Sequence, residues 1–143
     1  MKNKMLQISS LLFLVLTLAV VSVKAQGVVR LKGHIPFDFN VGNKNYKAED
    51  YSITLENPSK SPATMIMQDA KGSNLQIGFI QQSGKRSLRG KTTLTFNRYN
   101  DQYFLAEIAS PDFGLSILKS KVEQRIARKF RQRNFRPERV AVT

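Results

Sequence analysis

Hydrophobic and polar residues alternate along residues 28–41, which read VVRLKGHIPFDFNV. Every odd-numbered position from Val29 to Val41 is apolar or glycine, and most even-numbered positions are polar. A period of two over this length predicts a strand with one buried face and one solvated face. Pro36 cannot donate to a strand ladder, so the segment is either an edge strand or two strands joined by a bend at the proline.

Shorter runs downstream continue this pattern. They are YSITLE at 51–56 with Tyr51, Ile53 and Leu55 inward, the apolar ATMIMQ at 63–68, and LQIGFIQ at 75–81 with Leu75, Ile77 and Phe79 on one face. Turn-forming stretches separate them, the first being GNKN at 42–45. Six or seven strands without an intervening helix predict an all-β antiparallel meander, closed as a small barrel or packed as a sandwich.

A hairpin is predicted around Asn100-Asp101, between TTLTFNRY and QYFLAEIA. With this turn, paired residue numbers sum to 201, so one face holds Leu94, Phe96, Arg98, Tyr103, Leu105 and Glu107. The other face of the second strand carries Phe104, Ala106 and Ile108. A strand that is apolar on both faces needs a cover on both, so a further element must pack on this hairpin.

The basic segment at residues 119–139 can supply that cover. Ser120 and Glu123 form a capping-box pattern, which marks the start of a helix. Val122, Ile126 and Phe130 follow at helical spacing as a narrow apolar stripe. We therefore predict a docked amphipathic helix at about 120–131, with its basic residues in solvent, and a basic flexible tail at 132–143.

The first 25 residues have the layout of a secretory signal peptide. Lys2 and Lys4 precede an apolar run over 11–21, and small residues lead to a cleavage-like position after Ala25. The apolar run is shorter than the roughly 20 residues of a spanning helix. We expect export to the periplasm or outside the cell, and one domain over 26–131 with no transmembrane segment in the mature chain.

Three stretches resemble parts of a known group of sequences. IPFDFNVGNKNYKAEDYSIT (35–54) is similar to a segment with the pattern I-P-F-D-F-x-V-G-x-K-x-x-x-A-G-x-Y-x-I, found in small secreted bacterial proteins of unassigned function. FNRYNDQYFLAEI (96–108) and LKSKVEQRIAR (118–128) resemble their later hairpin and their Lys-Ser-x-x-Glu helix start. The chain departs from the pattern at Glu49-Asp50, where glycine is common. The resemblance implies a secreted β domain with a C-terminal helix and implies no activity.

The composition excludes several chemistries. The sequence contains no cysteine, which excludes thiol catalysis and haem attachment, and its one histidine is too few for a histidine-based zinc site. His34 lies on the polar side of the first strand, where we expect it to be exposed. SGKRSLRGK at 83–91 lacks the spacing of a phosphate-binding loop. We therefore expect no cofactor and no enzymatic activity.

Charge supplies the remaining candidates. The formal net charge is +13, and residues 119–139 hold nine basic and two acidic residues. The candidate anion-binding residues are Lys85, Arg86, Arg89, Lys91, Arg125, Arg128, Lys129, Arg131 and Arg133. Arg98 and Tyr103 form a predicted cation–π pair. Glu107 shares their predicted face, either as a rim ion pair or as a ligand contact inside a barrel.

Two functions follow from these observations. The first is a non-catalytic β module of the cell envelope that binds a small apolar ligand or a partner, or is structural. The second is a charge-driven binder of anionic polysaccharide, lipopolysaccharide or lipid, through the basic helix and the 85–91 loop. Because the chain is expected to be exported, a genomic nucleic-acid partner is not expected.

Overall fold

The computed structural model describes residues 27–88, 90–130 and 137–143. The strands are β1 (Val28–Ile35), β2 (Phe39–Val41), β3 (Lys44–Tyr46), β4 (Glu49–Glu56), β5 (Ala63–Gln68), β6 (Asn74–Gln82), β7 (Thr92–Tyr99), β8 (Gln102–Ala109), β9 (Gly114–Ser116) and β10 (Glu138–Val142), and the helix is α2 (Lys121–Phe130). The prediction of an all-β fold with a C-terminal helix is confirmed. Within these described ranges, no helix is long and apolar enough to cross a membrane.

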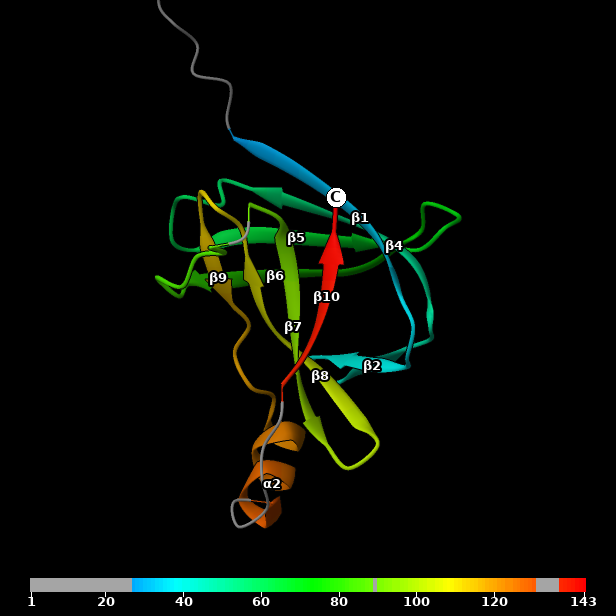
Figure 1. Ribbon diagram of the computed structural model, residues 1–143. Coiled ribbons are helices and arrows are strands. Elements are labelled where there is room, and N and C mark those ends of the chain that lie inside the picture. The colour runs from blue at the N-terminus through cyan, green and yellow to red at the C-terminus, as the bar shows by residue number, and fades with distance from the viewer. Residues whose placement is uncertain (1–26, 89, 131–136) are drawn as a thin grey trace, which may run out of the picture.

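The strands form a circuit that closes on itself (Figure 1). Antiparallel pairing runs from β1 through β4, β5, β6, β9 and β8 to β7, and then to β10. Thr143, just after β10, exchanges two backbone hydrogen bonds with Lys32 of β1, at 2.6 and 3.0 Å. Of the two predicted closures, the structure therefore has the barrel, because β10 joins the two sides that an open sheet would leave unpaired.

Large apolar side chains fill the interior of the barrel. The alternation predicted for the first strand is confirmed, since Leu31, Ile35, Phe39 and Val41 are buried and their even-numbered neighbours are not. The most deeply buried large side chains are Phe39, Phe96, Ile35, Ile53, Leu55, Met65, Met67, Ile80, Leu94, Ile108 and Leu115. An eight-stranded circuit encloses an interior of a size that side chains such as these can fill.

The bend expected at Pro36 separates β1 from β2. After it, β2 pairs in parallel with β8 and antiparallel with β3, and it lies beside β8 toward one end of the barrel (Figure 1). The turn predicted at 42–45 is shorter in the structure, because Lys44 already belongs to β3. Gly42 has φ of 62°, which a residue with a side chain rarely adopts.

The predicted inward face of 75–81 is not the one observed at the end of β6. Ile80 pairs with Ala63, and both are almost completely buried, so the even-numbered position faces the core there. A register shift between Met67 and Gln68 accompanies this change. Leu75 packs against the core only partly buried. The predicted inward side chains of Ile77 and Phe79 lie outside the described part of the structure.

Two strands near the C-terminus were not predicted. β9 lies between β6 and β8 and completes that side of the barrel. The flexible tail predicted at 132–143 is wrong for 138–142, because β10 pairs with β7 over five residues and buries Val142. Residues 131–136 lie outside the described residues. The last residues of the chain therefore form a strand that closes the barrel.

Candidate functional surfaces

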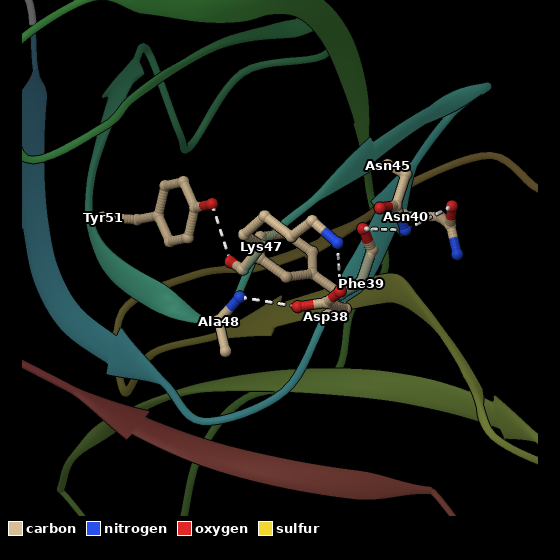
Figure 2. Close-up of polar contacts among 7 residues, drawn as sticks. All are labelled: Asp38, Phe39, Asn40, Asn45, Lys47, Ala48 and Tyr51. Carbon is tan, nitrogen blue, oxygen red and sulfur yellow. Dashed lines mark hydrogen bonds and ion pairs between the residues drawn. The ribbon is translucent and has the colours of Figure 1, made fainter.

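Asp38 organises the polar contacts at the bend before β2 (Figure 2). Its carboxylate accepts a hydrogen bond from the Ala48 amide at 2.9 Å and lies 2.8 Å from the Lys47 ammonium. The Tyr51 hydroxyl donates to the Lys47 carbonyl at 2.8 Å, which fixes the same loop from the other side. These contacts tie the bend after β1 to the connection between β3 and β4.

The charge state of this cluster follows from its contacts. The hydrogen bond from Lys47, followed by that from the Ala48 amide, lowers the pKa of Asp38, and the same ion pair raises the pKa of Lys47. Burial raises the pKa of the Tyr51 hydroxyl. Asp38 is thus held as an acceptor-only carboxylate that joins the bend before β2 to the connection between β3 and β4.

Glu107 does not share a face with Arg98 and Tyr103. A bulge at Ala106 shifts the register, so that Leu94 pairs with Ile108 and Thr95 pairs with Glu107. Ile108 points into the core, and the adjacent Glu107 therefore lies on the outer face. The predicted face shared with Arg98 and Tyr103 is therefore wrong, because one extra residue inverts every later position. Of the two alternatives for Glu107, the position excludes a ligand contact inside the barrel, and the contacts fit an ion pair.

On the outer face, Glu107 joins the start of the 83–91 loop. The Ser83 hydroxyl donates to Glu107 at 3.1 Å, and the Lys85 ammonium lies 3.8 Å from the other carboxylate oxygen. Glu107 is 16% exposed, whereas Lys85 is 78% exposed. The pair therefore anchors the base of the loop while leaving the lysine mostly in solvent.

Arg98 and Tyr103 lie together, as their opposed register predicts. The guanidinium carbon of Arg98 is 5.4 Å from the centroid of the Tyr103 ring. Phe37, which follows the bend, stacks on Tyr103 with centroids 4.0 Å apart. Arg98 also donates from Nε to the Asn100 carbonyl at 2.9 Å. These contacts cover the ring and brace the hairpin turn.

His34 has one carboxylate neighbour. Its Nδ1 atom lies 2.8 Å from Asp50 across the β1–β4 pair, and the two side chains are 62% and 75% exposed. Exposed groups of this kind lack the desolvated setting that activates a catalytic pair. In the described ranges, no three histidine or acidic side chains gather as metal ligands.

Helix α2 is attached through a buried carboxylate. Glu123 is 4% exposed and accepts hydrogen bonds from Asn97 Nδ2 at 2.7 Å and from the Tyr99 hydroxyl at 3.2 Å. Burial raises the pKa of Tyr99, and the neighbouring Lys119 opposes that shift. Ser120 caps the helix, since its hydroxyl accepts from the Glu123 amide at 3.1 Å.

The side of α2 that faces β7 differs from the predicted stripe. Glu123, Ile126, Ala127 and Phe130 are buried or half-buried, at the i, i+3, i+4, i+7 spacing of one helical face. Val122, predicted to pack, is 40% exposed. The most deeply buried side chain of the docked face is therefore a carboxylate, which a search for an apolar stripe does not detect.

The predicted anion-binding residues fall on two separate surfaces. Arg125, Arg128 and Lys129 are exposed on α2, and Lys85, Arg86 and Lys91 are exposed around the 83–91 loop. Lys121, which was not among the predicted residues, is also exposed on α2. The loop leads into the first residue of β7, whereas α2 contacts Asn97 and Tyr99 at the other end of that strand. Arg89, Arg131 and Arg133 lie outside the described residues.

Comparison with known proteins adds no assignment. No protein-family model, curated protein or solved structure matches this chain. Functional proposals for the chain therefore depend on the geometry and charge of the surfaces described above.

Proposed function

We propose that this chain is a non-catalytic β module of the cell envelope, with a barrel that acts as a scaffold for its surfaces. The apolar interior supports this proposal, because Phe39, Phe96 and Leu115 are almost completely buried where a barrel of this size could hold a small ligand. Among the described side chains, the histidine and the charged pairs are exposed or tied into structural contacts. The leader-like residues 1–25 support export.

Two measurements test this proposal. Expression of the full chain in a bacterial host, followed by fractionation and mass analysis, is expected to give an envelope or external product beginning at Gln26. Titration of that product with a fluorescent fatty acid is expected to show no stoichiometric uptake. Uptake of one probe per unmodified chain, or retention of the product in the cytoplasm, would contradict the proposal.

A specific observation supports charge-driven binding as a second function. Helix α2 carries four exposed cations, namely Lys121, Arg125, Arg128 and Lys129, and its single acidic residue, Glu123, is buried. The charged side chains that α2 exposes to solvent are therefore all cationic. At 1.5 Å of rise per residue, the cations cover about 12 Å along the helix axis, enough to contact several charges of an anionic polymer or lipid surface.

The experiment compares two variants with equal charge. One replaces the four cations of α2 by glutamine. The other makes the same change at four exposed cations elsewhere, Arg30 and Lys32 on β1 and Lys60 and Lys71 in two turns. We expect only the α2 variant to elute earlier from immobilised heparin, with binding that weakens as salt rises. Equal losses in both variants would show that net charge alone causes retention, and retention that salt does not weaken would exclude the mechanism.

A further inference from the structure

The tip of the 83–91 loop holds an apolar side chain completely in solvent. Leu88 is 99% exposed, more than any of the other exposed large apolar residues, which are Val28, Leu118 and Val122. Around it, Lys85, Arg86 and Lys91 are exposed, and the loop sequence contains no acidic residue. A single exposed apolar residue is common on protein surfaces, but Leu88 lies on a loop whose exposed charged residues are all basic.

The loop that carries Leu88 is fastened to the barrel. The Ser83 amide donates to the Gly114 carbonyl at 2.9 Å, and the Ser87 amide donates to the Ser110 carbonyl at 3.0 Å. The backbone lies so close that a Cβ on Gly114 would be 1.7 Å from the Lys85 carbonyl oxygen. Leu88 follows the second anchor directly, so the barrel sets where the exposed leucine projects.

We propose that this loop is a contact for anionic membranes, in which Leu88 enters the interface of the bilayer and Lys85, Arg86 and Lys91 contact lipid headgroups. This inference rests on the charge-driven function proposed above. It specifies a lipid as the partner of the 83–91 loop, the second of the two cationic surfaces. The charges alone would suit a polysaccharide equally well, but a polyanion provides no apolar environment for Leu88. A bilayer accommodates both features, since its interface takes up apolar side chains next to cations.

The chain offers a direct reporter because it contains no tryptophan. A Leu88→Trp variant of residues 26–143, which contain every described element and the complete strand circuit, has one indole at the loop tip. Its emission is measured with vesicles of phosphatidylcholine alone, with vesicles that also contain phosphatidylglycerol, and with soluble heparin. Leu118→Trp, at a residue that is 64% exposed and precedes α2, is the matched control.

We expect the Leu88→Trp emission to shift to the blue only with the anionic vesicles, and brominated acyl chains to quench it. The Leu118→Trp emission should change less. In co-sedimentation, Leu88→Asn should lower partitioning into anionic vesicles by on the order of tenfold, since an apolar side chain then no longer enters the bilayer. Arg86→Gln should lower it by roughly fivefold, the effect of one cation near such a surface. Neither residue is buried, so unchanged melting temperatures verify the fold.

Other results separate this inference from the function beneath it. Vesicle binding without a blue shift, or equal binding by Leu88→Asn, would overturn insertion and leave charge-driven binding intact. A larger blue shift for Leu118→Trp than for Leu88→Trp would show that the side of the chain near α2 contacts the membrane, and would exclude the loop as the contact. Binding to heparin with none to vesicles would identify a polymer partner and overturn the lipid. If the chain bound neither vesicles nor heparin, both this inference and the charge-driven function would be excluded.

Discussion

The buried carboxylate beneath α2 allows a quantitative prediction. Glu123→Ala removes the acceptor that Asn97 Nδ2 and the Tyr99 hydroxyl use at 2.7 and 3.2 Å. A hydrogen bond to a charged group contributes roughly 1.5–3 kcal/mol, and the longer contact falls at the weak end. Water that enters as the helix loosens can hydrogen-bond to the freed Asn97 and Tyr99 groups, and this recovers part of the lost free energy. We therefore expect Glu123→Ala to lower the free energy of unfolding by about 3 kcal/mol.

The amide variant separates hydrogen bonding from charge. Glu123→Gln keeps a carbonyl oxygen that can accept from Asn97, so we expect a loss of about 1 kcal/mol. For a domain of this length, 1 kcal/mol corresponds to roughly 4 °C in melting temperature, which predicts falls of about 12 °C and 4 °C for the two variants. Val122→Ala and Glu138→Gln are controls at exposed positions, and both should stay within about 0.5 kcal/mol of the parent chain.

Thermal melting by circular dichroism and amide hydrogen exchange measure these effects together. In Glu123→Ala we expect the α2 amides to lose protection at lower temperature than the β7 amides, because the helix depends on this attachment. If Glu123→Ala and Glu123→Gln melt alike and the α2 amides keep their protection, the hydrogen bonds to Asn97 and Tyr99 do not hold the helix, and the reasoning fails.

Three further predictions concern the loop and the bend. Gly114→Ala should cost about 2 kcal/mol in urea unfolding, since its new methyl would overlap the Lys85 carbonyl; an unchanged midpoint would contradict the tight contact. Because the pKa of Asp38 is lowered on folding, its stabilisation is present above about pH 4 and lost as pH falls further, so Asp38→Asn should differ from the parent chain at pH 7 and converge with it in acid. Because the pKa of Tyr51 is raised on folding, the parent chain should lose stability above about pH 10, and Tyr51→Phe should lose less between pH 9 and 11 in guanidinium midpoints.

The first strand shows how far a sequence pattern can lead. Leu31, Ile35 and Phe39 are buried as predicted, because the period-two rule is a geometric property of any extended strand. The rule also depends on an uninterrupted register. At Ala106 one extra residue moves Glu107 from the inner face to the outer face, and no glycine or proline marks the position in the sequence. A bulge of this kind arises from pairing with β7 and β9, which local sequence does not encode.

Strand β10 was missed for a different reason. Val140 and Val142 alternate with Arg139 and Ala141, which is a weak strand signal, but it directly follows a strongly basic run. Short polar strands gain their stability from pairing, and here both partners, β7 and β1, are remote in sequence. From the local sequence alone, the residues of β10 therefore resemble a flexible tail. In the structure they fold back onto the barrel, where Val142 is 5% exposed and lies against Gly33.

The same contacts that complete the fold also set the charge that a partner would meet. Glu123 is the only acid on α2, and its burial against Asn97 leaves the helix surface without a carboxylate. The positive field of α2 is therefore a consequence of how the helix docks. A truncation after Leu118 would remove α2 and β10 together, and could not separate binding from folding. Charge substitutions on the exposed face of α2 leave Glu123 and Val142 in place, so a loss of partner binding in those variants reports on the surface itself.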